Sequence, residues 1–291
     1  MTKIAPHSRA WLSAFAAILP GLLLATTYAA GEDYPTATTY RLRYQFHPGE
    51  TVRWQVVRQE AVRTSISGTT QLTESVTSST MAWRVKDVDA NGAATFEYTV
   101  EDADYWNHLS GHEPVRYNSK TDKVPPQGYT DVAQSIGKPL AIITLDPQGK
   151  LLGRQRMPVK GATASEGQFL TVPLPTAALA VGENWTLPAD VDLPLPNGMN
   201  KKIKMLQRFT LQDVKTGVAT ISMATEVLTP IHDPAIEARI IPHEQNGTIR
   251  FDIDEGRILS QQMDVNKQVV GFRGEVSNLQ QIARVTLTLT R

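Results

Sequence analysis

The chain has 291 residues, no cysteine, and equal numbers of basic and acidic residues, 29 of each. Without cysteine it can hold no disulfide and no lipidated cysteine, so it must fold on its hydrophobic core alone. The neutral charge balance argues against nucleic acid or an anionic membrane surface as the main partner, because both require a basic excess.

Residues 1–30 have the pattern of a secretory signal peptide. Lys3, His7 and Arg9 precede an uncharged apolar run over 11–25, and small residues follow it. This run contains a proline and is shorter than the roughly 20 residues that a membrane-spanning helix needs. We therefore expect the leader to be cleaved. The mature chain would then be extracytoplasmic, either periplasmic or secreted, with a slight acidic excess and no membrane span.

The first elements expected after the leader are strands. Tyr40 to Phe46 alternates apolar and polar residues and ends at the turn Pro48-Gly49-Glu50, and the alternation resumes over Val52 to Val56. The polar stretch from Thr64 to Thr80 fits either long, partly exposed strands or a loop.

The stretch from Thr80 to Glu101 is the clearest β-hairpin in the sequence. Its turn at 87–92 closes on a glycine, and apolar residues occupy alternate positions on both sides: Met81, Trp83, Val85, Ala94, Phe96, Tyr98 and Val100. A second copy follows over Lys204 to Leu228. In that copy Phe209 and Leu211 take the places of Trp83 and Val85.

Two more landmarks recur in the same order. The turn Pro48-Gly49-Glu50 followed by Trp54 resembles Val181-Gly182-Glu183 followed by Trp185, and the hairpin around Asp146–Gly149 resembles the one around Asp252–Gly256. This order predicts an ancestral duplication. The first β-rich repeat would span 39–158 and the second 168–291, with a flexible join near 160–167.

The fold class expected is mainly β, with duplicated antiparallel sheets and one short helix over Val132 to Ile136. Strands far outnumber helices, and no strand–helix alternation of the kind a parallel sheet needs is present. The two related halves could be separate lobes or one joined, curved sheet. Either way, four aromatic residues should lie on the apolar face: Trp54, Trp83, Phe96 and Tyr98.

Between Ala103 and Gly128 the alternation lapses, which predicts a long surface excursion with little regular structure. Four aromatic residues in or near it are candidate ligand-binding residues that could stack on a sugar or cover an apolar ligand: Tyr105, Trp106, Tyr117 and Tyr129. The alternative is a hydrophobic latch that pins the excursion to the sheet.

No catalytic, metal or cofactor motif stands out. Asp87 to Gly92 opens like a calcium-binding loop, but the twelfth position is Tyr98 instead of a carboxylate, so we interpret it as a hairpin turn. His108 and His112 are four residues apart beside Glu113, yet Gly111 and Pro114 disfavour the helix that would make them a zinc pair. No nucleophile elbow and no phosphate-binding glycine loop occurs.

Three stretches carry a resemblance to a known family: Tyr117 to Pro126, Val132 to Leu140 and Asp146 to Leu151, together with the turn Pro48-Gly49-Glu50. In these the chain resembles a family of uncharacterised secreted β-rich proteins of planctomycete-type bacteria. The resemblance implies an extracytoplasmic location and no known activity. Many relatives are lipoproteins, and this chain differs from them in lacking the lipidated cysteine.

The leading hypothesis for function is a non-enzymatic exported protein that binds an apolar or amphiphilic ligand or an envelope partner. One alternative is a hydrolase or metal-dependent enzyme that uses the Asp102–Glu113 region, and another is a structural envelope component. A cavity beneath the excursion would favour ligand binding, converging histidines and carboxylates would favour the enzyme, and a filled sheet face would favour the structural role.

Overall fold

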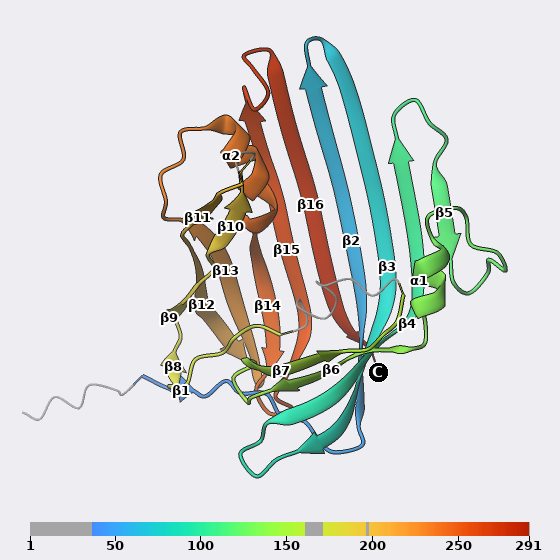
Figure 1. The fold of residues 1–291 in the computed structure, drawn as a ribbon. Coiled ribbons are helices and arrows are strands. Elements are labelled where there is room, and N and C mark those ends of the chain that lie inside the picture. The colour runs from blue at the N-terminus through green and yellow to red at the C-terminus, as the bar shows by residue number, and fades with distance from the viewer. Residues whose placement is uncertain (1–36, 161–170, 196–197, 291) are drawn as a thin grey trace, which may run out of the picture. The chain divides into compact units, whose positions relative to one another are not determined.

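The structure is a computed structural model that describes residues 37–160, 171–195 and 198–290. The expected leader over 1–30 and most of the expected join lie outside these residues. Within them, twelve strands form one antiparallel sheet (Figure 1). In spatial order eleven of them are β7 (Leu151–Arg156), β6 (Pro139–Leu145), β4 (Ala94–Leu109), β3 (Thr69–Val88), β2 (Thr51–Ile66), β16 (Ser277–Thr290), β15 (Arg257–Val270), β14 (Asn246–Asp252), β13 (Val218–Val227), β12 (Met205–Lys215) and β9 (Asn184–Pro188). The twelfth, β5 (Val115–Asn118), pairs with the part of β4 that extends beyond β6.

The expected fold class is confirmed, and of the two arrangements considered the joined one is correct. The polar stretch 64–80 belongs to the long strands β2 and β3, so the strand alternative holds there. Figure 1 shows these strands beside β16 and β15 in the middle of the sheet. The described residues also form two small sheets, β1 (Thr39–Tyr40) with β8 (Leu179–Ala180), and β10 (Val191–Pro194) with β11 (Asn200–Ile203).

The helix expected over 132–136 is present as α1 (Thr130–Ser135). A second helix, α2 (Pro234–Ile240), was not expected and continues into the 3-10 turn η1 (Ile241–His243). Its start carries a recognisable signal, because the Asp233 side chain accepts a hydrogen bond from Ala235 N at 2.8 Å and proline occupies the first turn. None of the helices in the described part of the chain has the length and apolar character that crossing a membrane requires.

The two halves of the sheet have the same strand order. The first runs β2, β3, β4, β6, β7 and the second runs β9, β12, β13, β14, β15, with each strand beside the next, while β16 joins β2 to β15. Both halves also carry register shifts at matching places. One lies after Val85 and after Leu211, and another lies after Thr144 and after Arg250.

The start of each half is fastened in the same way. Gly49 N donates to Val85 O at 3.0 Å, and Val85 N donates to the carbonyl oxygen of Glu50 at 2.9 Å. In the second half Gly182 N donates to Leu211 O at 2.7 Å, and Leu211 N to the carbonyl of Glu183 at 2.9 Å. These parallels support the duplication, which stays a prediction.

One detail of the predicted alignment differs. Val52 pairs with Trp83 and Trp185 pairs with Phe209, so Trp185 corresponds to Val52 and not to Trp54. The Trp185 ring lies parallel to Phe209 at a centroid distance of 5.2 Å. The tryptophan of the second half is therefore displaced by one inward-facing position relative to the first.

The main core lies on one face of the large sheet. The Trp83 ring stacks on Phe96 at a centroid distance of 4.0 Å and meets Trp54 edge-on at 4.9 Å. These three residues and Tyr98 are each no more than 2% exposed, as their alternation predicts. Aliphatic residues of β12 to β15 complete the same cluster, so the two halves share one core.

The prediction of an irregular surface excursion over 103–128 is wrong for the first part of that range. Strand β4 continues to Leu109 and pairs with β3 to that point, and β5 returns beside it. The alternation lapses because a register shift after Thr80 breaks the pattern, and because β4 then leaves the apolar core and carries half-exposed polar residues on both faces.

The strand expected over 40–46 is also different. Only Thr39 and Tyr40 form a strand, while Leu42, Tyr44 and Phe46 are buried in the main core without being part of the large sheet. The backbone here bonds to two turns, since Tyr44 N donates to Pro147 O at 2.7 Å and Gln45 N donates to Gly256 O at 3.0 Å. We call residues 41–47 the strap.

Candidate functional site

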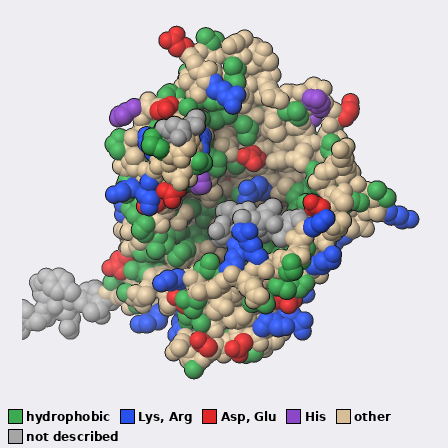
Figure 2. Space-filling model, in the orientation of Figure 1, with side chains coloured by type: hydrophobic (Ala, Val, Ile, Leu, Met, Phe, Trp, Pro, Cys, Tyr) green, Lys and Arg blue, Asp and Glu red, His purple; other side chains and the backbone are tan. Residues whose placement is uncertain are grey.

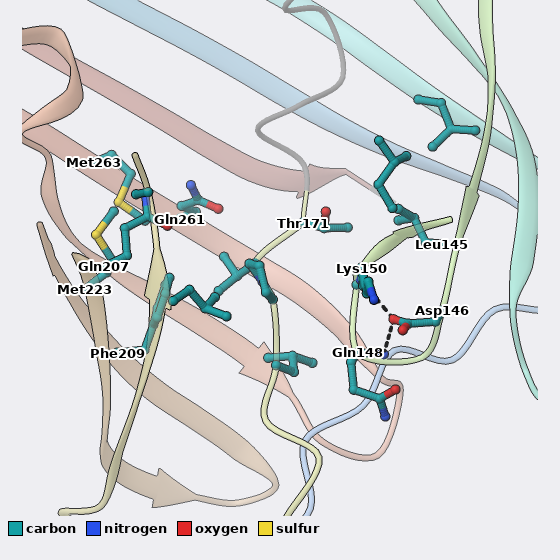
Figure 3. Close-up of a pocket in the computed structure, with 18 of the residues that line it drawn as sticks. Leu145, Asp146, Gln148, Lys150, Thr171, Gln207, Phe209, Met223, Gln261 and Met263 are labelled. Atoms are coloured by element: carbon teal, nitrogen blue, oxygen red, sulfur yellow. Dashed lines mark hydrogen bonds between the residues drawn. The ribbon is translucent and has the colours of Figure 1, made fainter. Parts of the chain in front are cut away.

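A pocket of about 930 Å³ lies on the core face of the sheet, between the β6–β7 hairpin of the first half and strands β9, β12 and β13 of the second. In Figure 2 this face is hollowed, and hydrophobic side chains gather beside the hollow. Its lining includes the apolar residues Leu145, Leu174, Leu187, Phe209, Met223 and Met263. Figure 3 shows Met223 and Met263 at one side of the pocket and the β6–β7 turn at the other.

One wall of the pocket is the segment 171–174, which crosses between the two halves. Three contacts hold it: Leu174 N donates to Gln148 O at 2.8 Å, Trp185 Nε1 donates to Pro173 O at 2.9 Å, and Val172 is bonded to Tyr44. The Tyr44 hydroxyl accepts from Val172 N at 2.8 Å and donates to Val172 O at 3.1 Å. The wall is thus fixed by the first half, the second half and the strap.

The strap is hydrogen-bonded to two turns, and each of these turns requires a glycine. Gly149 has φ +78°, and a Cβ there would lie 2.6 Å from the Tyr44 ring. Gly256 has φ +60°, and a Cβ there would lie 2.5 Å from Gln45 N. Both positions combine a left-handed backbone with close approach of the strap, and only glycine meets both conditions without strain.

Polar side chains line both sides of the pocket, and Thr171 lies between them. At the β6–β7 end are Asp146, Lys150 and Arg154, and Asp146 Oδ1 accepts from the backbone N of Gln148 at 2.9 Å and of Lys150 at 2.8 Å, as Figure 3 shows. At the other end are His243, carried by η1, and three glutamines, Gln207, Gln245 and Gln261.

His243 is the titratable group at this second end. Its side chain is exposed at the rim of the pocket, and partial desolvation there lowers its pKa below the ordinary value of 6.5. The imidazole is therefore neutral at neutral pH. With its neutral amides and imidazole, this end of the pocket carries no formal charge.

The position of His243 depends on the packing of α2 and η1. Ile236 and Ile240 of α2 are buried in a small cluster with residues of β10, β11 and β12. Ile241 of η1 is buried against Val265 and Val269 of β15. The helix that was not predicted is therefore the element that brings His243 to the pocket.

The four aromatic residues predicted to bind a ligand do not line this pocket, and no residue of 103–128 lines it. Tyr105 and Tyr117 each lie within 6 Å, centroid to centroid, of Tyr129, and Asn107 Nδ2 donates to the Tyr129 hydroxyl. Trp106 lies on the opposite face of β4, 5.9 Å from the His108 ring. Three of the four thus come together as the latch considered above, and their ligand-binding role stays a prediction.

The histidines of the predicted alternative site do not converge. His108 Nδ1 lies 3.3 Å from Glu74 Oε2, whereas His112 and Glu113 are exposed in the β4–β5 turn. Within the described residues, no three histidine, aspartate or glutamate side chains come close enough together to hold a metal ion. The Asp87–Gly92 segment forms a hairpin turn, in which Asp89 Oδ1 accepts from Asn91 N at 2.8 Å and Ala93 N at 2.9 Å.

Replacing His108, His112 and Glu113 together by alanine is expected to lower the free energy of unfolding by less than about 1 kcal/mol. The groups are exposed or half-exposed, and the main interaction that the substitution removes is the His108–Glu74 pair. Thermal melts of the parent and the triple variant, each with and without a chelator, check this. A parent whose melting temperature drops on chelation to that of the variant would revive the metal site.

Comparison with known proteins adds little to the fold. No protein-family model matches the sequence, and no curated protein matches it. The chain is similar to a solved structure described as lipid–protein interactions in lipovitellin, with 11% identity and a TM-score of 0.44 over 85% of this chain and 26% of that one. It is also similar to DynF from the dynemicin biosynthesis pathway of Micromonospora chersina, with 6% identity and a TM-score of 0.21 over 94% and 92%.

The chain therefore spans about a quarter of the lipovitellin chain it matches. At these scores the two likenesses carry no functional conclusion. The resemblance in sequence to secreted proteins of planctomycete-type bacteria stays a prediction.

Proposed function

We propose that this chain is an exported, non-enzymatic binding protein that holds an apolar or amphiphilic ligand in the pocket between the two halves of its sheet. Export is inferred from the leader expected over 1–30. Binding is inferred from the pocket, and the single observation that carries it is a mainly apolar lining around about 930 Å³.

The size and chemistry of the pocket support this proposal. Small-molecule sites commonly have volumes of about 300–1,000 Å³, apolar walls and a few polar groups. Here the walls come from Leu187, Phe209, Met223 and other apolar side chains, and a smaller number of polar side chains lie among them. Methionine also suits a pocket whose ligand varies in shape, because its side chain is flexible and its sulfur is polarizable.

The rim of the pocket is held in a fixed position, which favours binding. Segment 171–174 is hydrogen-bonded to the hydroxyl of buried Tyr44, and the β6–β7 turn is hydrogen-bonded to the Tyr44 backbone. From the second half, Trp185 donates a hydrogen bond to the same segment. A pocket that is already formed avoids the entropic cost of ordering loops when a ligand binds. A sheet face with a structural role alone would instead be expected to be filled by its own side chains.

Leu187→Trp is expected to weaken the binding of a neutral apolar probe such as N-phenylnaphthylamine by at least about tenfold, equivalent to about 1.4 kcal/mol. Leu187 lines the pocket and is half-buried at the sheet edge, so the larger indole can occupy pocket volume without disrupting the main core. Fluorescence titration of the probe into the parent and the variant measures the effect.

The matched control is Leu228→Trp, which places the same side chain at an exposed position outside the pocket. It should leave the probe affinity unchanged. A parent that does not bind the probe, or equal binding by the parent and both variants, would contradict the proposal. Mass spectrometry of the protein taken from its native envelope without denaturation would then identify the bound compound.

A further inference from the structure

One polar side chain of the pocket lies at a core position of the sheet. Gln261 of β15 is 9% exposed, and the residues paired with it across the sheet are Ile249 of β14 and Leu287 of β16, both buried in the main core. Gln261 also lines the pocket, and Figure 3 shows it on the same side as Met223 and Met263. A glutamine thus occupies an inward position of β15 at which an apolar residue is expected.

The amide oxygen of this glutamine is buried without a partner. Gln261 Oε1 has no hydrogen-bond partner among the described residues. The other two glutamines of the pocket differ, because Gln245 Nε2 donates to Pro242 O at 3.1 Å and Gln207 is half-buried, so that solvent reaches it. A buried acceptor without a donor destabilises the folded protein. Sequences depart in this way from the pattern of their fold mainly at functional sites.

The surroundings of Gln261 favour a neutral partner. Gln261 also lines a second, small cavity of about 10 Å³, together with Gln245 and four apolar residues, and no charged side chain is among the described residues that line it: Val56, Met263, Val285 and Leu287 are the apolar four. A charged group brought to this place would lose its hydration and meet no opposite charge. A hydroxyl group carries no charge, and it can donate the hydrogen bond that the amide oxygen lacks.

We propose that the ligand is an uncharged apolar molecule that carries a hydroxyl group, and that this hydroxyl donates a hydrogen bond to Gln261 Oε1. The apolar body then lies against apolar residues of the same pocket, such as Phe209, Met223 and Met263. This inference rests on the proposed function and adds the chemical class of the ligand. An ether or a carboxylate in the same place could accept a hydrogen bond but could not donate one.

The first test compares decanol with its isomer nonyl methyl ether, which differs from it in having no hydrogen on the oxygen. Each displaces N-phenylnaphthylamine from the parent protein and from Gln261→Met, a variant that keeps the approximate size of the side chain and removes its amide. The ratio of alcohol affinity to ether affinity is expected to fall by about fivefold in the variant, the effect of one net hydrogen bond. Decanoate should bind the parent more weakly than decanol does.

The matched control is Gln207→Met, which makes the same substitution at a half-buried position of the same pocket. It should leave the ratio of alcohol affinity to ether affinity unchanged, because the inference assigns the hydroxyl to Gln261 alone. Thermal melts of both variants confirm that they are folded.

The second test needs no ligand. In the ligand-free protein, Gln261→Met is expected to raise the urea concentration at the midpoint of unfolding, since an apolar side chain of similar size replaces a buried amide oxygen that has no partner. Gln207→Met should change the midpoint little. A lower midpoint for Gln261→Met would show that the amide already serves the fold, for example through a water in the small cavity, and would overturn the inference.

The binding outcomes separate this inference from the proposed function. If the ratio is the same in the parent and in Gln261→Met, if Gln207→Met lowers it as much, or if decanoate binds as tightly as decanol, the assignment of a hydroxyl to Gln261 is wrong while ligand binding stands. If neither decanol nor the ether displaces the probe from the parent, the proposed function itself fails.

Discussion

Replacing Trp83 by alanine is expected to lower the free energy of unfolding by about 3–5 kcal/mol, the usual loss when a large buried aromatic side chain is truncated. Trp83 is 1% exposed and is in contact with Phe96, Trp54 and Phe46 at the centre of the shared core. Strand β3, which carries Trp83, is paired with β2 on one side and β4 on the other, so the sheet resists collapsing into the cavity that the truncation leaves. Denaturation by urea, followed by circular dichroism, measures the change.

The matched control is Trp106→Ala. Trp106 is half-buried on the opposite face of β4, where its ring neighbour is His108, so its truncation should cost much less than that of Trp83. Equal losses at the two positions would show that alternation along the hairpin does not identify the core. Trp83→Phe should fall between parent and alanine variant, because it keeps an aromatic ring in the core and removes an indole N–H that has no hydrogen-bond partner among the described residues.

Tyr44→Phe is expected to lower the free energy of unfolding by about 2–4 kcal/mol. The hydroxyl of this buried residue both accepts from Val172 N and donates to Val172 O, and its loss leaves two buried backbone groups without a partner, each costing about 1–3 kcal/mol. The control is Tyr40→Phe, since the Tyr40 hydroxyl makes no hydrogen bond to a described residue. If Tyr40→Phe cost as much, the effect could not be assigned to the Val172 contact.

Tyr44 also makes the stability of the folded protein depend on pH. Burial raises the pKa of Tyr44 well above its ordinary value of 10.0. Above pH 10 the unfolded chain loses this proton while the folded protein keeps it, so the folded state binds more protons and its stability falls as pH rises. Tyr44→Phe should therefore show a shallower loss of stability above pH 10 than the parent, as measured by urea denaturation at a series of pH values.

The sequence predicts those parts of the fold that depend on neighbours along the chain. The hairpin from Thr80 to Glu101 and its copy were predicted because inward residues such as Trp83 and Phe209 alternate with polar ones on either side of a glycine turn. Helix α2 could have been predicted from Asp233 and Pro234, which mark its start. The C-terminal part of β4 could not be predicted, because its residues do not alternate between an apolar and a polar face.

The pocket could not be predicted, because its walls come from residues far apart in the sequence. Leu145 and Phe209 line the same cavity, and their positions depend on how the two halves approach each other. The strap contributes to that approach, because its backbone is hydrogen-bonded to one turn of each half, and both turns lie more than 100 residues away from it in the sequence. The aromatic residues near 103–128 were chosen because they lay in an apparent loop, and three of them instead pack on one another.

The place of β16 in the sheet has a consequence for the order in which the protein folds. This last strand lies between β2, the first long strand, and β15, and pairs with β2 from Ser277 to Thr290. While it is absent, each half presents a long unpaired edge that can recruit strands from other chains. Closing the centre of the sheet must therefore wait until β16 has been synthesised, and contacts of such large sequence separation form slowly. Until β16 is in place, these exposed strand edges make the chain prone to aggregation.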